Sequence, residues 1–155
     1  MNSIPLMELL DKDKFILRPT VGVSMEPLLH QNTTLVLIVK EFQTPKKGDV
    51  VLFERKDGSL ILHRVVKATD SFFYIRGDNC YFNEKVVMSQ IRGLVVQIYR
   101  NGKFFEVDNS FFYRLYTFYI LTSYPFRFVL MKVKNKVRGA LRRIKHLFGR
   151  FRNGR

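Results

Sequence analysis

The hydrophobic pattern between residues 15 and 107 is that of short β-strands. Six runs are rich in β-branched and aromatic residues and are bounded by turn residues, which is typical of strands. Asp57-Gly58 and Asn101-Gly102 accept the positive φ angles that tight hairpins need. The sequence therefore predicts an antiparallel, barrel-like β domain. The predicted strands cover residues 15–18, 34–39, 50–53, 60–66, 72–76 and 91–99, and a short helix is predicted over residues 4–12.

The pattern changes after Asp108. A stretch rich in Phe and Tyr comes first, and in the stretch after it ten Lys and Arg residues accompany apolar residues at helical spacing. The second stretch is typical of a basic amphipathic helix. We therefore expect a mainly β fold with a C-terminal helical, basic extension. The predicted boundaries are 1–108 for the β domain, with its core at 15–107, 109–131 for the aromatic apolar segment and 132–155 for the basic tail.

Charge divides the chain at the same place. Residues 1–108 carry 15 basic and 13 acidic side chains, whereas residues 109–155 carry 12 basic side chains and no acidic one. Most of the net charge of +14 therefore belongs to the C-terminal segment. Such asymmetry indicates an anionic partner for that segment, and we expect this partner to be an anionic membrane surface. No motif for specific nucleic-acid recognition accompanies the charge.

Composition narrows the chemistry further. A chain of 155 residues with 46% hydrophobic residues is long and apolar enough to form a core. Cys80 is its one cysteine, so an intrachain disulfide and a cysteine-rich metal site are both excluded. We expect the protein to use neither a cofactor nor a metal ion.

Four short motifs follow one another along the chain. They are Ser24-Met25-Glu26-Pro27, Gly48-Asp49-Val50-Val51-Leu52-Phe53, His63-Arg64-Val65 and Gly77-Asp78-Asn79. In this order and spacing they resemble the type I signal peptidases, and more closely the branch that uses histidine, within a superfamily that includes LexA-like peptidases. The resemblance covers roughly residues 18–98 and implies a largely antiparallel, barrel-like peptidase fold.

The resemblance implies catalysis by a serine and a histidine. A serine hydroxyl becomes a useful nucleophile when an adjacent base takes its proton. Histidine, whose ordinary pKa is about 6.5, can take a proton at neutral pH. At the matching positions of this chain we expect Ser24 to be the nucleophile and His63 the general base. The implied activity is that of a serine endopeptidase that cleaves a signal or leader peptide from an exported peptide, after small residues.

The acid that orients the histidine departs from the family's pattern. Two acidic residues usually follow the Gly-Asp-Asn motif by a few positions, and here Asn83 and Glu84 occupy those positions. Glu84 is the first candidate for the orienting acid, because a carboxylate orients the imidazole and stabilises its charged form. Asp78 is the second candidate, although its side chain could instead hold the loop.

The oxyanion hole also departs from the pattern. Signal peptidases often carry a serine two residues before the nucleophile, and here Gly22 occupies that position. The backbone N–H of Ser24 remains as a donor, while the loss of one donor costs about 2.7–4 kcal/mol of transition-state stabilisation.

The segment after Asp108 predicts membrane association, either peripheral or through a C-terminal anchor. Only 12 uncharged residues separate Arg114 from Arg127, which is too short for a span of roughly 20 residues. If both arginines snorkel to the surface, a longer span can form. We favour an in-plane interfacial segment, since Tyr and Phe suit the headgroup boundary. The other interpretation is a helix packed on the β domain, followed by a solvated arm.

Two other functions fit parts of the sequence. One is a LexA-like regulator that cleaves its own chain, but the residues before Ser24 contain neither the small dipeptide that such proteins cleave nor a helix-turn-helix. The other is a catalytically silent, basic protein that binds membrane or RNA. The departures at Gly22, Asn83 and Glu84 leave this second alternative open.

Overall fold

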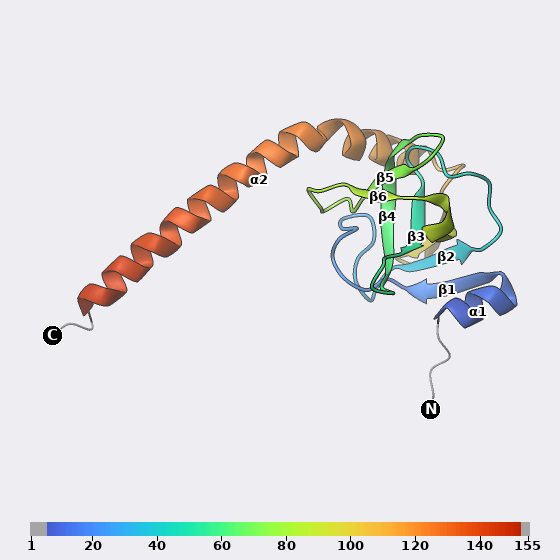
Figure 1. Cartoon of the computed structure of the whole chain (residues 1–155), viewed down its shortest axis with the longest axis horizontal. Coiled ribbons are helices and arrows are strands. Elements are labelled where there is room, and N and C mark those ends of the chain that lie inside the picture. Colours follow the sequence, from blue (N-terminus) through green and yellow to red (C-terminus); the bar gives the residue numbers. More distant parts are fainter. Residues whose placement is uncertain (1–5, 153–155) are drawn as a thin grey trace, which may run out of the picture. The chain divides into compact units, whose positions relative to one another are not determined.

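The computed structural model describes the backbone of residues 6–152 and the side chains of residues 6–130 and Val133 (Figure 1). The chain divides into two compact units, Met1–Leu121 and Thr122–Arg155. The first unit contains α1, all the described strands and the beginning of α2. The elements in chain order are α1 (Leu6–Asp13), β1 (Phe15–Pro19), β2 (Leu35–Val39), β3 (Val50–Glu54), β4 (Leu60–Ala68), β5 (Phe73–Arg76), β6 (Glu84–Val86), the 3-10 turn η1 (Met88–Gln90), β7 (Ile91–Arg100), β8 (Lys103–Glu106) and α2 (Phe111–Arg152).

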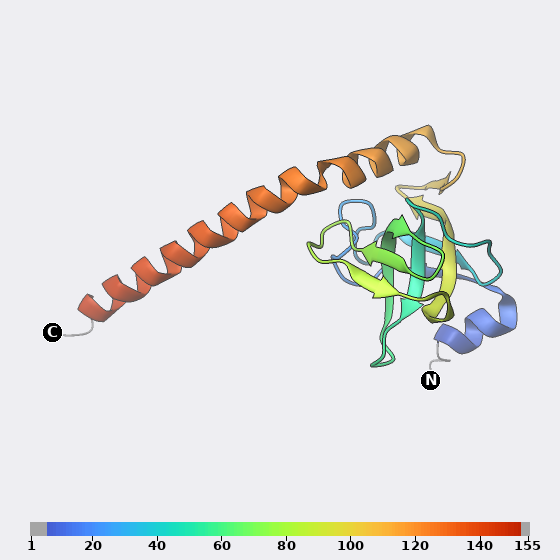
Figure 2. The same cartoon turned by 45° about the horizontal axis from the view of Figure 1, so that its top comes forward.

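The strands form one antiparallel sheet in the order β1-β2-β7-β3-β4-β5-β6, with β8 paired to β7 beyond this path (Figure 2). The predicted antiparallel β domain is confirmed, but the predicted barrel is not. Closure of a barrel requires the first and last strands of the path to pair. In the described part of the chain β1 pairs only with β2 and β6 only with β5, so the sheet is open. The hydrophobic pattern identifies strands one at a time and contains no information about this closure.

The core consists of two apolar clusters. The first cluster contains residues from α1, the loop after Ser24 and strands β2 and β7. The second contains residues from β3, β4, β5 and β6. Strand β3 contributes to both clusters, because Val50 and Leu52 belong to the first and Val51 and Phe53 to the second. Both faces of β3 are therefore buried, and the continuous apolar run of this strand is what such a position requires.

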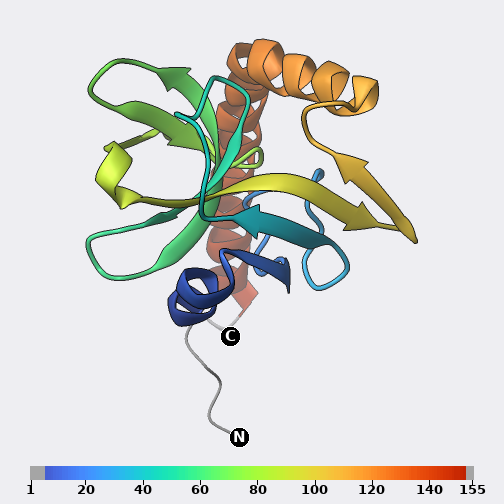
Figure 3. The same ribbon diagram turned by 90° about the vertical axis from the view of Figure 1, so that its right-hand side faces the viewer.

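All six predicted strands are present, with bounds that agree to within two residues. Strands β6 and β8 were not predicted. Strand β6 has three residues, two of them charged, and β8 exposes all four of its side chains. Neither has the alternation that indicates a half-buried strand. Figure 3 shows the long β7 (yellow) turning back into β8 before the chain leads to α2.

Helix α2 begins at Phe111 and continues through Pro125. Its residues up to Leu121 belong to the first compact unit, so this unit ends later than the predicted boundary at Asp108. Among the described residues, no helix has the length and apolarity needed to cross a membrane. Apart from Val133, which is exposed, the predicted amphipathic face of the basic tail lies outside the residues whose side chains the structure describes.

Candidate active site

Strands β4 and β6 place the predicted base beside the first candidate acid. His63 lies in β4 with 2% of its surface exposed, and Glu84 begins β6. Nδ1 of His63 lies 3.1 Å from Oε1 of Glu84, although the two groups are not aligned as a hydrogen bond. The structure thus brings His63 and Glu84 together, as the resemblance implies for a base and its orienting acid.

The surroundings favour a neutral imidazole beside an ionised carboxylate. Burial lowers the pKa of His63 and outweighs the charge of Glu84, which acts to raise it. Arg55 donates two hydrogen bonds to Glu84, of 2.6 and 2.7 Å, and these lower the pKa of that carboxyl. At neutral pH His63 can therefore accept a proton, and Glu84 carries the charge that would stabilise the imidazolium.

Gly77 lies where the Ser24 loop meets His63. A Cβ atom at Gly77 would lie 2.5 Å from the carbonyl oxygen of Ser24 and 3.0 Å from Nε2 of His63. The Sγ of Cys80 would be 2.8 Å away. Only glycine leaves room for this approach. The nitrogen of His63 that faces away from Glu84 is therefore the one beside the Ser24 loop.

Asn79 holds the Ser24 loop in place. Its backbone N–H donates to the carbonyl oxygen of Ser24 at 2.8 Å, and its side-chain amide donates to the carbonyl oxygen of Val23 at 3.2 Å. Met25 and Leu29 anchor the same loop in the core.

The hydroxyl of Ser24 makes no hydrogen bond with another residue that the structure describes. Bonds between a nucleophile and its base are often long in the absence of substrate.

Asp78, the second candidate acid, binds Arg64. Its two carboxylate oxygens accept hydrogen bonds of 2.7 Å each from Nε and Nη2 of Arg64. Arg64 is fully buried, and although burial opposes its charge, the contacts with Asp78 raise its pKa above the ordinary value. Arg64 follows His63 in β4, and Asp78 precedes Asn79. The pair therefore fastens β4, which carries His63, to the loop that contacts the backbone of Ser24. Of the two candidate acids, Glu84 is the one whose carboxylate lies beside the His63 ring.

Three side chains from the first turns of α2 form hydrogen bonds with this ion pair. Nη1 of Arg64 donates to the hydroxyl of Tyr113 at 2.9 Å and to that of Thr117 at 3.0 Å. The hydroxyl of Tyr116 donates to Oδ2 of Asp78 at 3.0 Å. Part of the segment that the sequence assigned to a membrane surface is thus packed against the candidate site. Sequence reasoning missed these roles, and the only signal was the spacing of the hydroxyl-bearing residues along one helical face.

Arg55 is another residue that sequence reasoning missed. It lies just after β3, 29 residues before Glu84, and no motif links the two. Strand pairing brings them together, since β3 pairs with β4, β4 with β5 and β5 with β6.

An apolar cavity of about 270 Å³ adjoins Ser24. Its lining combines the loop around Gly22 and Arg18 of β1 with apolar side chains from α1 and β1–β4. Gly22 itself has a φ of +85°, a left-handed conformation that glycine adopts without strain. The serine that the family often carries at this position would be strained here, so the glycine follows from the backbone geometry of this loop.

The described residues contain no group of three or more His, Cys, Asp and Glu side chains that could hold a metal ion.

Comparisons of the chain with family models, with curated proteins and with solved structures give no match.

Proposed function

We propose that the protein is a serine endopeptidase that removes a signal or leader peptide from an exported peptide. The observation that carries the proposal is the buried His63, which has Glu84 at 3.1 Å on one side and the Ser24 loop on the other. A buried histidine with a lowered pKa, a carboxylate at one nitrogen and a serine loop at the other is the arrangement that base-assisted acyl transfer needs.

The chemistry follows from these positions. Nε2 of His63 takes the proton of the Ser24 hydroxyl while Oγ attacks the scissile carbonyl carbon, and the negative charge of Glu84 stabilises the imidazolium. The imidazolium then gives its proton to the leaving amine as the peptide bond breaks, which leaves an acyl ester on Ser24. A water molecule, deprotonated by His63, hydrolyses the ester and restores both side chains.

The cavity beside Ser24 supports a substrate with small apolar side chains. Its volume of about 270 Å³ is below the roughly 300–1,000 Å³ that is typical of small-molecule sites. Its walls include Leu52, Ile61 and Leu62, so an apolar side chain would be covered there. Arg18 also lines the cavity, so a basic side chain would meet a like charge. These features agree with the small residues that signal peptidases accept before the scissile bond.

We further propose that the protein associates with an anionic membrane surface. In the first unit, helix α2 exposes several large apolar side chains, which water contacts at an energetic cost. A helix lying in the membrane interface would bury such side chains without crossing the bilayer. The exposed side chains are Phe111, Phe112, Leu115, Phe118 and Tyr119.

A cleavage assay with purified protein tests the peptidase. We expect the wild-type chain to cleave members of a set of leader-type peptides that carry alanine before the junction, with the products identified by mass spectrometry. Ser24→Ala should abolish cleavage, whereas Ser89→Ala, which changes an exposed serine on η1, should leave it intact. Equal cleavage by Ser24→Ala and wild type would refute the assignment. Complete inertness of the folded wild-type chain toward the set would favour the catalytically silent alternative.

A further inference from the structure

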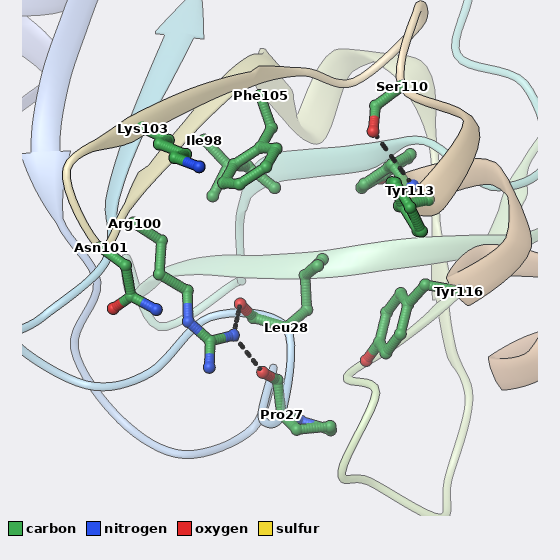
Figure 4. Close-up of a pocket in the computed structure, with 11 residues that line it drawn as sticks. Pro27, Leu28, Ile98, Arg100, Asn101, Lys103, Phe105, Ser110, Tyr113 and Tyr116 are labelled. Carbon is green, nitrogen blue, oxygen red and sulfur yellow. Dashed lines mark hydrogen bonds between the residues drawn. The ribbon is translucent and has the colours of Figure 1, made fainter.

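A second cavity lies between the β7–β8 hairpin and the start of α2 (Figure 4). Its volume of about 510 Å³ falls within the roughly 300–1,000 Å³ that is typical of ligand sites. Leu28, Ile98, Phe105, Phe112 and Tyr113 are among the apolar residues that line it. All of them belong to the compact unit that ends at Leu121, so the cavity is formed within one unit.

Two cationic side chains stand at one end of this apolar cavity, and Figure 4 shows both of them beside the hairpin turn. Neither Arg100 nor Lys103 forms an ion pair with an acidic side chain in the part of the chain that the structure describes. Nη1 of Arg100 donates to the carbonyl oxygens of Pro27 and Leu28, at 3.1 and 3.4 Å. These acceptors are neutral, so the positive charge of Arg100 has no carboxylate to balance it.

The aromatic side chains at the mouth of the cavity are poorly covered. Phe112 is 77% exposed and Phe105 is 40% exposed. Exposed apolar area costs about 25 cal/mol per Å² relative to its burial, and exposed apolar surface rimmed by polar groups marks binding sites. The apolar part of a ligand would cover both rings, and an anionic end group would pair with the two cations.

We propose that this cavity binds a long-chain fatty acid, with its chain between Phe105 and Phe112 and its carboxylate at Arg100 and Lys103. A small inorganic anion would pair with the two cations but would leave the apolar walls of the cavity in contact with water. A neutral alkyl chain would fill the walls but leave the cations without a counter-charge. The fatty acid supplies both features in one molecule, and guanidinium and ammonium groups bind carboxylates through charge-assisted hydrogen bonds. The proposal does not depend on peptidase activity.

The binding test uses cis-parinaric acid, a fatty acid whose fluorescence rises when its chain enters an apolar site. The full-length protein is titrated at fatty-acid concentrations below those at which micelles form. We expect saturable binding to one site, displaced by palmitate and displaced much less by methyl palmitate, which lacks the charge. In Arg100→Gln/Lys103→Gln, we expect the affinity for the acid to fall about tenfold or more, while the affinity for the ester stays unchanged.

Glutamine retains a donor at each position, so the backbone contacts of Arg100 have a replacement and the fold should persist. The matched control is Lys56→Gln/Lys67→Gln, which removes two charges from exposed positions outside the cavity and should bind as the wild type does. In Phe112→Glu the new negative charge at the mouth should also weaken binding of the acid. Equal displacement by acid and ester, or equal weakening in the control and cavity variants, would overturn the proposal. Binding that never saturates would also overturn it, because it would indicate adsorption to the surface.

Discussion

Arg64 and Asp78 form a buried, bidentate ion pair that joins the strand of His63 to the loop that holds Ser24. The two hydrogen bonds are both 2.7 Å long, and the side chains are almost fully enclosed. The contribution of the pair is to fix the positions of His63 and the Ser24 loop relative to each other, which is the kind of support that the proposed catalysis would need.

Asp78→Ala should destabilise the protein strongly, because it leaves the charge of Arg64 buried without a partner. Breaking a buried ion pair in this way costs about 3–5 kcal/mol. The free energy of unfolding, measured by urea denaturation, should fall by that amount in Asp78→Ala and by much less in Asp70→Ala, which changes an exposed aspartate. A similar loss in both variants would show that the pair does not stabilise the fold.

The pKa of His63 should be measurable by NMR, independently of any substrate. We expect its ring protons to titrate below pH 6.5, since burial lowers its pKa. In Glu84→Gln the negative charge is lost while Arg55 remains, so the pKa of His63 should fall further. The chain also contains His30 and His146, so the signals of His63 are identified as those that are lost in His63→Gln. A rise of the His63 pKa in Glu84→Gln would contradict the electrostatic picture of the site.

The same pKa has a consequence for stability and for activity. The folded protein keeps His63 neutral at pH values where the unfolded chain, with a pKa of about 6.5, binds a proton. The neutral His63 therefore contributes fully to stability above pH 6.5. This contribution decreases as the pH falls from 6.5 toward the pKa that His63 has in the folded protein. The proposed peptidase activity should decrease only as the pH falls through the lowered pKa of His63 in the folded protein, because the protonated imidazole cannot act as a base.

The sequence predicts strands well and their long-range partners poorly. Alternation and turn residues are local signals, so β1–β5 and β7 could be recognised without knowledge of the fold. Strand β6 is too short and too polar to be recognised, although it carries Glu84. The assignment of Glu84 came from the resemblance, while its contact with Arg55 depends on the pairing of four strands.

The aromatic segment shows a second limit. A helix rich in Phe and Tyr has the same composition whether it faces lipid or protein, so the sequence alone favoured one environment for the whole segment. In the structure one face of the helix is buried against the first unit and another face is exposed. Tyr113 and Ile120 are buried within the first unit, whereas Phe111 and Phe118 are exposed. The direction of each side chain depends on where the helix meets the sheet, which the pattern does not specify.

Gly22→Ser should destabilise the protein even though it restores a hydroxyl that the signal peptidases often have there. A non-glycine residue in the left-handed conformation costs about 1–2 kcal/mol. Nothing lies within 4 Å of a Cβ atom at Gly22, so the loss would come from the backbone conformation alone. Gly22→Asn should lose less, because asparagine tolerates this conformation. Val23→Ser, at the exposed neighbouring position, is the control in thermal unfolding. An equal or higher melting temperature for Gly22→Ser would contradict this explanation of the glycine.

Gly77→Ala should reduce peptidase activity far more than it reduces stability. The new Cβ atom would lie 2.5 Å from the carbonyl oxygen of Ser24, and backbone cannot yield as a side chain can. A displacement of a nucleophile by about 1 Å can cost on the order of 100-fold in rate. Adding Cys80→Ala to Gly77→Ala removes the nearby thiol and leaves the contact with Ser24, so activity should not recover. Recovery in the double variant would assign the effect to Cys80 and not to the Ser24 loop.

Tyr116→Phe should weaken the support that α2 gives to the candidate site. The substitution removes the hydroxyl that donates to Asp78 and keeps the ring, which lies beside the guanidinium of Arg64. The loss of one hydrogen bond costs about 0.5–1.5 kcal/mol, or more when the acceptor is charged. Tyr99→Phe is the matched control, since the Tyr99 hydroxyl makes no hydrogen bond with another described residue. Because Asp78 belongs to the loop that holds Ser24, kcat should fall in Tyr116→Phe while KM changes little. Identical stability and kcat in Tyr116→Phe, Tyr99→Phe and the wild type would mean that α2 packs against the site without supporting it.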